Sequence, residues 1–192
     1  LPRAHQDNLK IINRSGEHLL ELINDVLEIA KIESNRATLE PFAFDLHALI
    51  LDLKKMFQVR TDSKEVLFEV HGIDELPRYV VADEKKLRVV LINLLGNAVK
   101  FTQNGQISMR LSLRKEGSEA MILGVEVEDT GPGIAEGERD KLFKYFIQTE
   151  SGKLSRSGTG LGLAISQDYI RIMGGEISVT SRVGEGSIFR FA

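Results

Sequence analysis

The sequence predicts an α+β fold, a two-layer α/β sandwich in which a mixed sheet of about five strands carries three helices on one face, preceded by a long N-terminal helix. Two observations predict it. Residues 9–30 place apolar or small residues at steps of three and four, and after Pro41 segments of helical period alternate with segments in which every second residue is apolar. The 192 residues are 42% hydrophobic and 28% charged, a composition that excludes a disordered tail and a membrane-embedded chain.

The N-terminal segment predicts one long helix. Its apolar or small residues repeat as a coiled-coil seam requires, at Leu9, Ile12, Gly16, Leu19, Ile23, Val26 and Ala30. Leu20, Leu22, Leu27 and Ile29 widen this surface beyond what a two-stranded contact covers, so we expect burial in a bundle of helices. Packing against the chain's own domain is the alternative.

Three helices are expected after a domain boundary between about residues 33 and 41. Asp45 and Asp83 are suited to the N-cap position, where a carboxylate accepts a hydrogen bond from a free amide of the first turn. The first helix has the apolar face Leu46, Leu49, Ile50, Leu53 and Phe57. The second continues to about Thr102 with the apolar face Leu87, Val90, Leu91, Leu94, Leu95 and Ala98, and the third spans 161–173.

Five short segments predict the strands of the sheet. They are residues 66–70, 107–113, 121–127, 177–181 and 187–191. The second and third flank a turn signalled by Gly117, so we expect them to be adjacent and antiparallel. The last two should form a closing hairpin around Gly184 and Gly186.

Charge and composition exclude several classes of function. The 25 Lys and Arg against 28 Asp and Glu leave a net charge of -3 with both signs interspersed, so no nucleic-acid partner is expected. There is no cysteine, and the four histidines (His5, His18, His47 and His71) show no ligand spacing. No stretch approaches the roughly 20 apolar residues of a membrane span, and neither a signal peptide nor an initiator Met is present. We therefore expect a soluble, cytoplasmic piece of a longer protein.

One predicted helix carries polar residues along one face. Asn93 and Asn97 lie four apart and Lys100 follows three later, so the three side chains point the same way. An Asn carbonyl oxygen suits Mg²⁺, which takes few protein ligands and completes its shell with water and phosphate. A solvated polar face or a capping Asn is the alternative on these positions alone.

A carboxylate and two glycines follow the strand at 121–127. In the run Asp129-Thr130-Gly131-Pro132-Gly133-Ile134, the glycines permit close approach of the backbone, and a flat ligand could enter there. A buried Asp needs a hydrogen-bond donor, which the exocyclic amine of a purine would supply. An ordinary turn is the alternative.

A second glycine-rich run opens the last helix. Successive backbone amides and the positive end of that helix make Gly158-Thr159-Gly160-Leu161-Gly162-Leu163 a candidate cradle for phosphate. No Lys-Ser or Lys-Thr follows it, and no central parallel strand precedes it, so a P-loop and a dinucleotide fold are both disfavoured.

Taken together and in this order, the three runs resemble the catalytic and ATP-binding domain of sensor histidine kinases, in the Bergerat-fold ATPase superfamily. Residues 93–102 are similar to that family's N box, 129–134 to its first glycine box and 158–163 to its second. Gly174-Gly175 and the run from Gly184 to Ser187 resemble its closing glycine turns. The resemblance implies that residues 37–192 are the catalytic domain.

Position by position, the resemblance implies a site for ATP and Mg²⁺. It implies that Asn97 coordinates Mg²⁺, that Asn93 supports the metal and phosphate site, and that Lys100 contacts phosphate, which makes these three the catalytic residues. It implies that Asp129 accepts a hydrogen bond from the adenine amine. The other implied nucleotide-binding residues are Gly131, Gly133, Ile134, Phe146, Gly158, Thr159, Gly160, Leu161, Gly162 and Leu163.

Residues 135–157 resemble the flexible ATP lid of that family, whose closure commonly gates such reactions. Phe143 and Phe146 are similar to its aromatic box, with simple packing of the lid as the alternative. Lys144 and Tyr145 depart from the pattern, which usually has an acidic residue and Pro at these positions.

Residues 1–36 resemble the second helix of the family's dimerisation and phosphoacceptor hairpin. The acceptor motif, a His followed by an acidic residue and an Arg-Thr-Pro run, is absent. The implied partners are the phosphoacceptor helix of the same kinase, the receiver domain of a response regulator and, in the full-length protein, a second copy. The fragment alone is not expected to autophosphorylate.

Asn93 favours transfer over hydrolysis. Hydrolytic relatives in the superfamily have a Glu four residues before the metal-binding Asn, and that Glu activates water. A neutral amide is a poor general base, so the γ-phosphoryl stays available to an imidazole. A superfamily ATPase, and a nucleotide-binding or dimerising regulatory module without transfer activity, are the alternatives.

Overall fold

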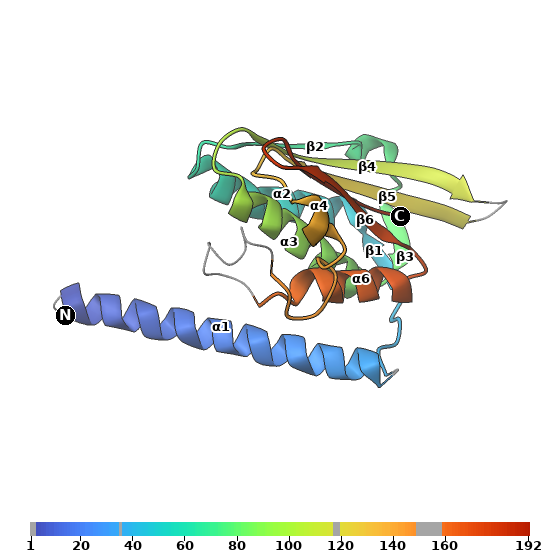
Figure 1. Ribbon diagram of the computed structural model, residues 1–192. Helices are drawn as coiled ribbons and strands as arrows, with labels where there is room; N and C mark the ends of the chain where they lie inside the picture. The colour runs from blue at the N-terminus through green and yellow to red at the C-terminus, as the bar shows by residue number, and fades with distance from the viewer. Residues whose placement is uncertain (1–2, 35, 117–119, 149–158) are drawn as a thin grey trace. The chain divides into compact units, whose positions relative to one another are not determined.

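The computed structural model describes residues 3–34, 36–116, 120–148 and 159–192 (Figure 1). The chain divides into two compact units, Leu1–Thr38 and Leu39–Ala192. Each unit is considered by itself. None of the described helices combines the length and the apolar composition needed to cross a membrane.

The first unit is built on one helix, α1, which spans Arg3–Glu33 and so extends the predicted helix at both ends. The apolar seam leaves Ile12, Leu19, Ile23 and Val26 between 48% and 64% exposed. No other helix or strand is found among the described residues of this unit, so its apolar stripe has no partner there.

The second unit contains the predicted mixed sheet of five strands, in the order β2-β4-β5-β7-β6. These strands are β2 (Leu67–His71), β4 (Gln106–Glu116), β5 (Ala120–Asp129), β7 (Gly186–Phe191) and β6 (Ile177–Arg182). β2 pairs with β4 in parallel, and the other pairs are antiparallel, including β4 with β5 and the closing hairpin β6–β7. The predicted sheet is confirmed.

Three helices cover one face of this sheet, as Figure 1 shows. They are α2 (Leu46–Asp62), α3 (Glu84–Phe101) and α6 (Gly162–Ile172). The apolar faces predicted for α2 and α3 are buried, and the sheet meets them with the buried side chains of Ile107, Met109, Leu111, Val125, Val127, Phe189 and Phe191. Alternation along the strands therefore separates a core face from a solvent face. The layer of helices and the layer of strands enclose one core, as predicted.

Both N-cap predictions are confirmed. Asp45 Oδ1 accepts from Ala48 N at 2.9 Å, and Asp83 Oδ1 accepts from Lys86 N at 3.0 Å. Asp83 is the more deeply placed of the two, since its side chain is 1% exposed. Its Oδ2 also accepts from Lys86 Nζ at 2.7 Å and from the backbone amide of Glu40 at 3.1 Å. This carboxylate therefore joins the start of α3 to the segment that leads into the domain.

Four short elements were not predicted. β1 (Phe42–Asp45) and β3 (Tyr79–Ala82) form a separate antiparallel pair, and η1 (Ile73–Glu75) and α4 (Glu136–Arg139) are single turns. Elements of three or four residues are too short to display a period, so periodicity cannot detect them.

We expect Asp83→Ala to lower the free energy of unfolding by about 2–4 kcal/mol, because it removes an N-cap and takes the ion-pair carboxylate away from the nearly buried ammonium of Lys86. Urea denaturation followed by circular dichroism measures this. Asp45→Ala, which removes a solvent-facing cap, is the matched control and should cost less.

The same carboxylate predicts a pH dependence. Burial raises the pKa of Asp83, but hydrogen bonds from the Lys86 side chain, the Lys86 amide and the Glu40 amide outweigh it and hold this pKa below the ordinary value. Its contribution to stability is therefore present above about pH 4 and lost as the pH falls through the folded-state pKa. Asp83→Ala should accordingly lose less stability on acidification than the wild type does; equal losses would contradict the assignment.

Candidate functional site

Asp129 is a buried carboxylate at the end of a central strand. It lies on β5 between Ile107 of β4 and Ser187 of β7, and its exposed fraction is 7%. Its Oδ1 accepts from the backbone amide of Gly131 at 2.8 Å. Burial raises the pKa of Asp129 above its ordinary value, and the neighbouring charge of Glu128 adds to this, while hydrogen bonds from Gly131 and Ser187 only partly oppose them. An added donor would stabilise this carboxylate further.

Two buried serines connect the loop after Asp129 to the closing hairpin. Ser181 Oγ accepts from Ile134 N at 2.8 Å and donates to Gly186 O at 2.7 Å. Ser187 Oγ lies 3.1 Å from Ser181 Oγ. The hydroxyls therefore hold the loop at 130–134 against the turn between β6 and β7.

Glycine is required where this loop meets the hairpin. Gly133 has a φ of 70°, and a Cβ there would lie 1.9 Å from the carbonyl oxygen of Arg182. Gly184 N donates to Pro132 O at 2.8 Å from the other side. Only a residue without a Cβ permits this approach, so the glycines of the run serve geometry rather than flexibility.

Asn93 joins α3 to the first turn of α6. Its Nδ2 donates to Gly162 O at 3.0 Å and to Ser166 Oγ at 3.2 Å, and Ser166 Oγ donates to Gly162 O at 2.7 Å. A Cβ on Gly162 would lie 3.2 Å from the amide carbon of Asn93. The second glycine-rich run therefore begins its helix directly against the polar face of α3.

The first glycine-rich run meets the C-terminal end of α3. A Cβ on Gly131 would lie 2.7 Å from Asp129 Oδ1 and 3.3 Å from the carbonyl oxygen of Phe101. Asn93 and Phe101 stand near opposite ends of the same polar face. Three runs that are far apart in the sequence are thus brought together along one helix.

Asn97 and Lys100 lie between these two contacts and are half-buried. Within the described part of the chain, the Asn97 side chain makes no hydrogen bond. The ammonium of Lys100 lies 4.8 Å from the ring centroid of Phe101, and burial lowers the pKa of this lysine. An anion beside Lys100 would favour its charged form. The arrangement therefore offers an amide oxygen and a cation near one carboxylate and two glycine-lined loops.

Comparisons with known proteins identify the family. Residues 82–192 match the family described as "Histidine kinase-, DNA gyrase B-, and HSP90-like ATPase". The chain belongs to this family.

The similar proteins narrow the membership to sensor histidine kinases. The signal transduction histidine-protein kinase BarA of Escherichia coli (strain K12) is 34% identical over 192 residues, which are 100% of this chain and 21% of BarA. The aerobic respiration control sensor protein ArcB of the same strain is 37% identical over 191 residues, 98% of this chain and 24% of ArcB. The crystal structure of full-length ShkA in complex with AMPPNP has a TM-score of 0.82 and 32% identity, covering 100% of this chain and 39% of ShkA.

This chain therefore contains the ATP-binding catalytic domain of a sensor histidine kinase. It spans about a fifth to a quarter of the length of these curated relatives, 21% of BarA and 24% of ArcB. The match covers all three runs of the site.

Most other residues predicted for the site lie near these contacts in the kinase domain. Thr159 Oγ1 accepts from Leu161 N at 3.1 Å, Leu161 is fully buried, and Leu163 is half-buried. Phe146 is 65% exposed, and its amide donates to Gly160 O at 3.1 Å. Gly158 and residues 149–157 of the predicted lid lie outside the described residues.

Ser181 and Ser187 are the site residues that the sequence analysis missed. Each occupies a core-facing position of a strand and is at most 5% exposed. A hydroxyl at an inward position of an alternating pattern is a usable signal, because a buried polar group needs a partner. The pattern does not say which partner it has.

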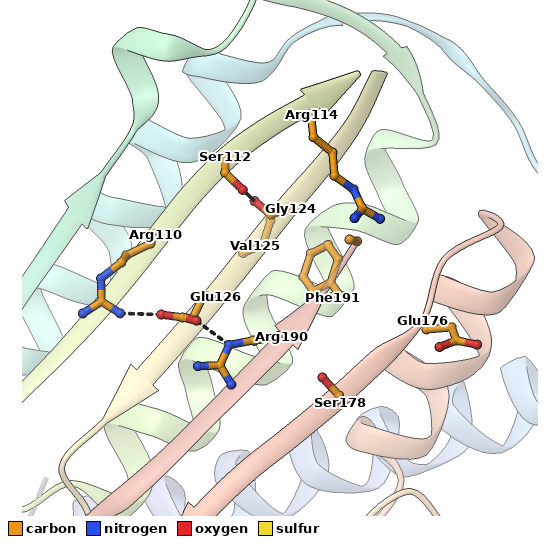
Figure 2. A pocket seen from close by; sticks show the side chains of 11 residues that line it. Arg110, Ser112, Arg114, Gly124, Val125, Glu126, Glu176, Ser178, Arg190 and Phe191 are labelled. Carbon is orange, nitrogen blue, oxygen red and sulfur yellow. Dashed lines mark hydrogen bonds and ion pairs between the residues drawn. The ribbon is translucent and has the colours of Figure 1, made fainter. Parts of the chain in front are cut away.

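A concavity of the kinase domain lies on the face of the sheet opposite to α2, α3 and α6 (Figure 2). There Glu126 binds both Arg110 and Arg190, each at 2.5 Å, and Arg110 also reaches Glu128 at 2.6 Å. These side chains alternate with the core-facing residues of β5, so they lie on the opposite face from Asp129. The charges there compensate one another, and the candidate site is the one around α3.

We expect the ionised carboxylate of Asp129 to lower the stability of the kinase domain at neutral pH. Because its folded-state pKa is raised, the native state holds this proton more tightly than the unfolded chain, and stability falls as the pH rises through the raised pKa. Asp129→Asn keeps an oxygen for Gly131 and removes the buried charge. We expect the melting temperature of Asp129→Asn at pH 7 to equal or exceed that of the wild type.

The difference between the two melting temperatures should shrink as the pH falls below the raised pKa of Asp129, because the wild-type carboxyl is then protonated. Asp74→Asn, an exposed change in η1, is the control and should have no effect. A clear destabilisation by Asp129→Asn at neutral pH would contradict the prediction.

Proposed function

We propose that this domain binds Mg-ATP along α3 and transfers the γ-phosphoryl group to a histidine on a separate helix. The single observation that supports it best is the meeting of three runs on one helix: Gly131 at Phe101, Gly162 at Asn93, and Asn97 with Lys100 between them. Residues 37–192 would be the catalytic domain, and residues 1–36 the second helix of a dimerisation hairpin.

The adenine end of the proposed site is built around Asp129. A buried carboxylate whose pKa is raised by burial gains from a neutral donor such as the adenine amine. Gly131 and Gly133 set the course of the loop beside Asp129, since side chains at either position would collide with the backbone or with Asp129 itself. Ile134 is fixed through Ser181, which supports the floor of this pocket.

The phosphate end is built around the start of α6 and Lys100. Backbone amides at a helix N-terminus favour an anion, and Gly160 and Gly162 allow it to approach them closely. Lys100 has its pKa lowered by burial, so a nearby phosphate would stabilise its charge.

The donor set fits Mg²⁺ bound largely through phosphate. Over the described residues, no group of three or more His, Asp or Glu side chains could hold a metal ion. Asn97 presents an amide without a hydrogen-bond partner among the same residues. Mg²⁺ keeps several waters and takes substrate phosphates as ligands, so a site that offers one neutral protein oxygen is compatible with it. Asn97 would therefore hold the metal, and the metal would neutralise phosphate charge.

Phosphoryl transfer then rests on placement rather than on a base. The imidazole nitrogen of the acceptor forms a bond to the γ-phosphorus, the bond to the bridging oxygen breaks, and ADP leaves. Asn93 cannot activate water, because it is a neutral amide whose nitrogen already donates to Gly162 and Ser166. Transfer to histidine is therefore favoured over hydrolysis.

The proposed partners follow from the relatives. BarA and ArcB are a histidine-protein kinase and a sensor protein, respectively. We propose the phosphoacceptor helix of the same kinase and a response-regulator receiver domain as partners. The exposed seam of α1 would be covered in a homodimer of the longer protein.

Calorimetric titration with ATP tests the site. In the presence of Mg²⁺, Asp129→Asn should weaken ATP binding about tenfold or more, since a hydrogen bond between adenine and a buried carboxylate is lost. Asn97→Ala should abolish the gain in affinity that Mg²⁺ gives the wild type. Asn104→Ala, an exposed amide beyond α3, is the matched control. Wild-type affinity in both site variants would refute the assignment.

Transfer is tested by supplying the acceptor hairpin as a separate polypeptide with labelled ATP. We expect acid-labile, base-stable label on the hairpin and none on this chain alone. Rapid steady-state hydrolysis without label would instead indicate an ATPase. Binding of ATP with neither label nor hydrolysis would indicate a regulatory module.

A further inference from the structure

Tyr145 attaches the segment before residue 149 to α6. Its hydroxyl donates to Asp168 Oδ2 at 2.5 Å, from half-buried positions on both sides. A proline at residue 145, which the family pattern would favour, has no group that could make this bond. The two residues are 23 positions apart, so the bond links two separate elements rather than adjacent turns.

A second contact lies beside the first. Phe146 N donates to Gly160 O at 3.1 Å. Phe146 has a φ of 62°, in the left-handed region that non-glycine residues rarely adopt. Gly160 has a φ of 73°, and a Cβ there would lie 3.0 Å from Ile147 O. The segment around residue 146 is therefore pressed against the backbone of the second glycine-rich run.

The conformation of Phe146 needs support from its surroundings, because such backbone strain persists only where neighbouring contacts determine it. Its own side chain is 65% exposed and supplies little. The preceding residue, Tyr145, is held by Asp168, which fixes the chain direction entering Phe146. The residue held by the side-chain hydrogen bond, Tyr145, is thus directly followed by the residue with the strained backbone, Phe146.

Asp168 is directed mainly at Tyr145. Its side chain is 18% exposed, and its Oδ1 lies 3.9 Å from Nη1 of Arg171, whose side chain is 64% exposed. An ion pair this long and this exposed contributes little. The first turn of the same helix is held to α3 by the contact of Asn93 with Gly162. Tyr145 is therefore linked to α3, the helix that carries Asn97, through α6: Asp168 of α6 binds Tyr145, and Gly162 of α6 binds Asn93.

We propose that Tyr145 and Asp168 are positioning residues for nucleotide binding: their hydrogen bond holds Phe146 against Gly160, so that the backbone at residues 160–162 has its phosphate-binding shape before ATP arrives. This rests on the proposed function, since it assigns phosphates to that backbone. Neither side chain is assigned a contact with the nucleotide. A preformed loop lowers the cost of ordering on binding, so the bond contributes to affinity for the phosphates and not for the adenosine part.

Affinities for two ligands separate this role from a general structural one. Calorimetry with ATP and Mg²⁺, and NMR titration with adenosine, are carried out on the wild type, Tyr145→Phe, Asp168→Ala and the double variant. We expect each single variant to bind ATP about three- to tenfold more weakly and the double variant to lose no more than either. Adenosine affinity should be unchanged.

Matched variants control for the chemistry removed. Tyr79→Phe removes an exposed hydroxyl on β3, and Arg171→Gln removes the long ion pair without touching the hydrogen bond; both should bind ATP as the wild type does. Asp168→Asn keeps an acceptor oxygen for the tyrosine hydroxyl and should restore most of the affinity lost in Asp168→Ala.

The outcomes distinguish this inference from the proposed function. If the wild type fails to bind ATP with Mg²⁺, the proposed function fails and this inference with it. If the wild type binds and Tyr145→Phe binds equally well, the inference alone is overturned. It is also overturned if the two single losses add in the double variant, or if adenosine binding falls by the same factor as ATP binding. Tyr145→Phe is conservative enough to decide the matter even if Asp168→Ala does not fold.

Discussion

The close packing of two glycines against α3 is the constraint on which the site depends. Gly162 lies against the amide of Asn93, and Gly131 lies against the carbonyl of Phe101, at distances that a Cβ would shorten to 3.2 Å and 3.3 Å. These contacts are possible because the opposite face of α3 is buried against the sheet through side chains such as Leu91 and Leu95, which are fully enclosed. The core thus places the helix, and the helix places both loops.

Asp129 shows how this fold retains a group that does not favour its stability. The carboxylate is buried and its pKa is raised, with hydrogen bonds from Gly131 and Ser187 offsetting only part of the desolvation. The loop beside it is fixed by Ser181 and by the backbone of the β6–β7 turn, so the carboxylate cannot turn out to water without breaking several contacts. A purine amine would add a hydrogen-bond donor to those that Gly131 and Ser187 already provide to Asp129. A carboxylate whose pKa is shifted by burial is typical of a binding site.

The two faces of the sheet differ in how their charged and polar groups are placed. On the uncovered face, Glu126 binds two arginines and needs nothing further. On the covered face, α3 carries the amide of Asn97 and the ammonium of Lys100, whose pKa burial lowers. The proposed site lies on the covered face, where burial shifts the pKa values of Asp129 and Lys100, and the Tyr145–Asp168 bond is proposed to support it.

The sequence by itself determined the helices and strands that show a clear hydrophobic periodicity, and the helix starts that have an N-cap residue. Helices with broad apolar faces, strands with alternation, and N-caps at Asp45 and Asp83 all follow from contacts within a few residues, which a local pattern records. The motif runs were also visible, and their order was enough to indicate the family. Elements of three or four residues, such as β1 and β3, were missed because they are shorter than any period.

Only the tertiary structure decided which groups meet. The bond of Asn93 to Gly162 joins residues 69 positions apart, Ile134 reaches Ser181 across 47, and Tyr145 reaches Asp168 across 23. No local pattern encodes such pairs, because each depends on how the sheet orders its strands and on where the buried face of α3 sets that helix. The residue types at the site could therefore be listed from the sequence, whereas their partners arise from the packing of the core.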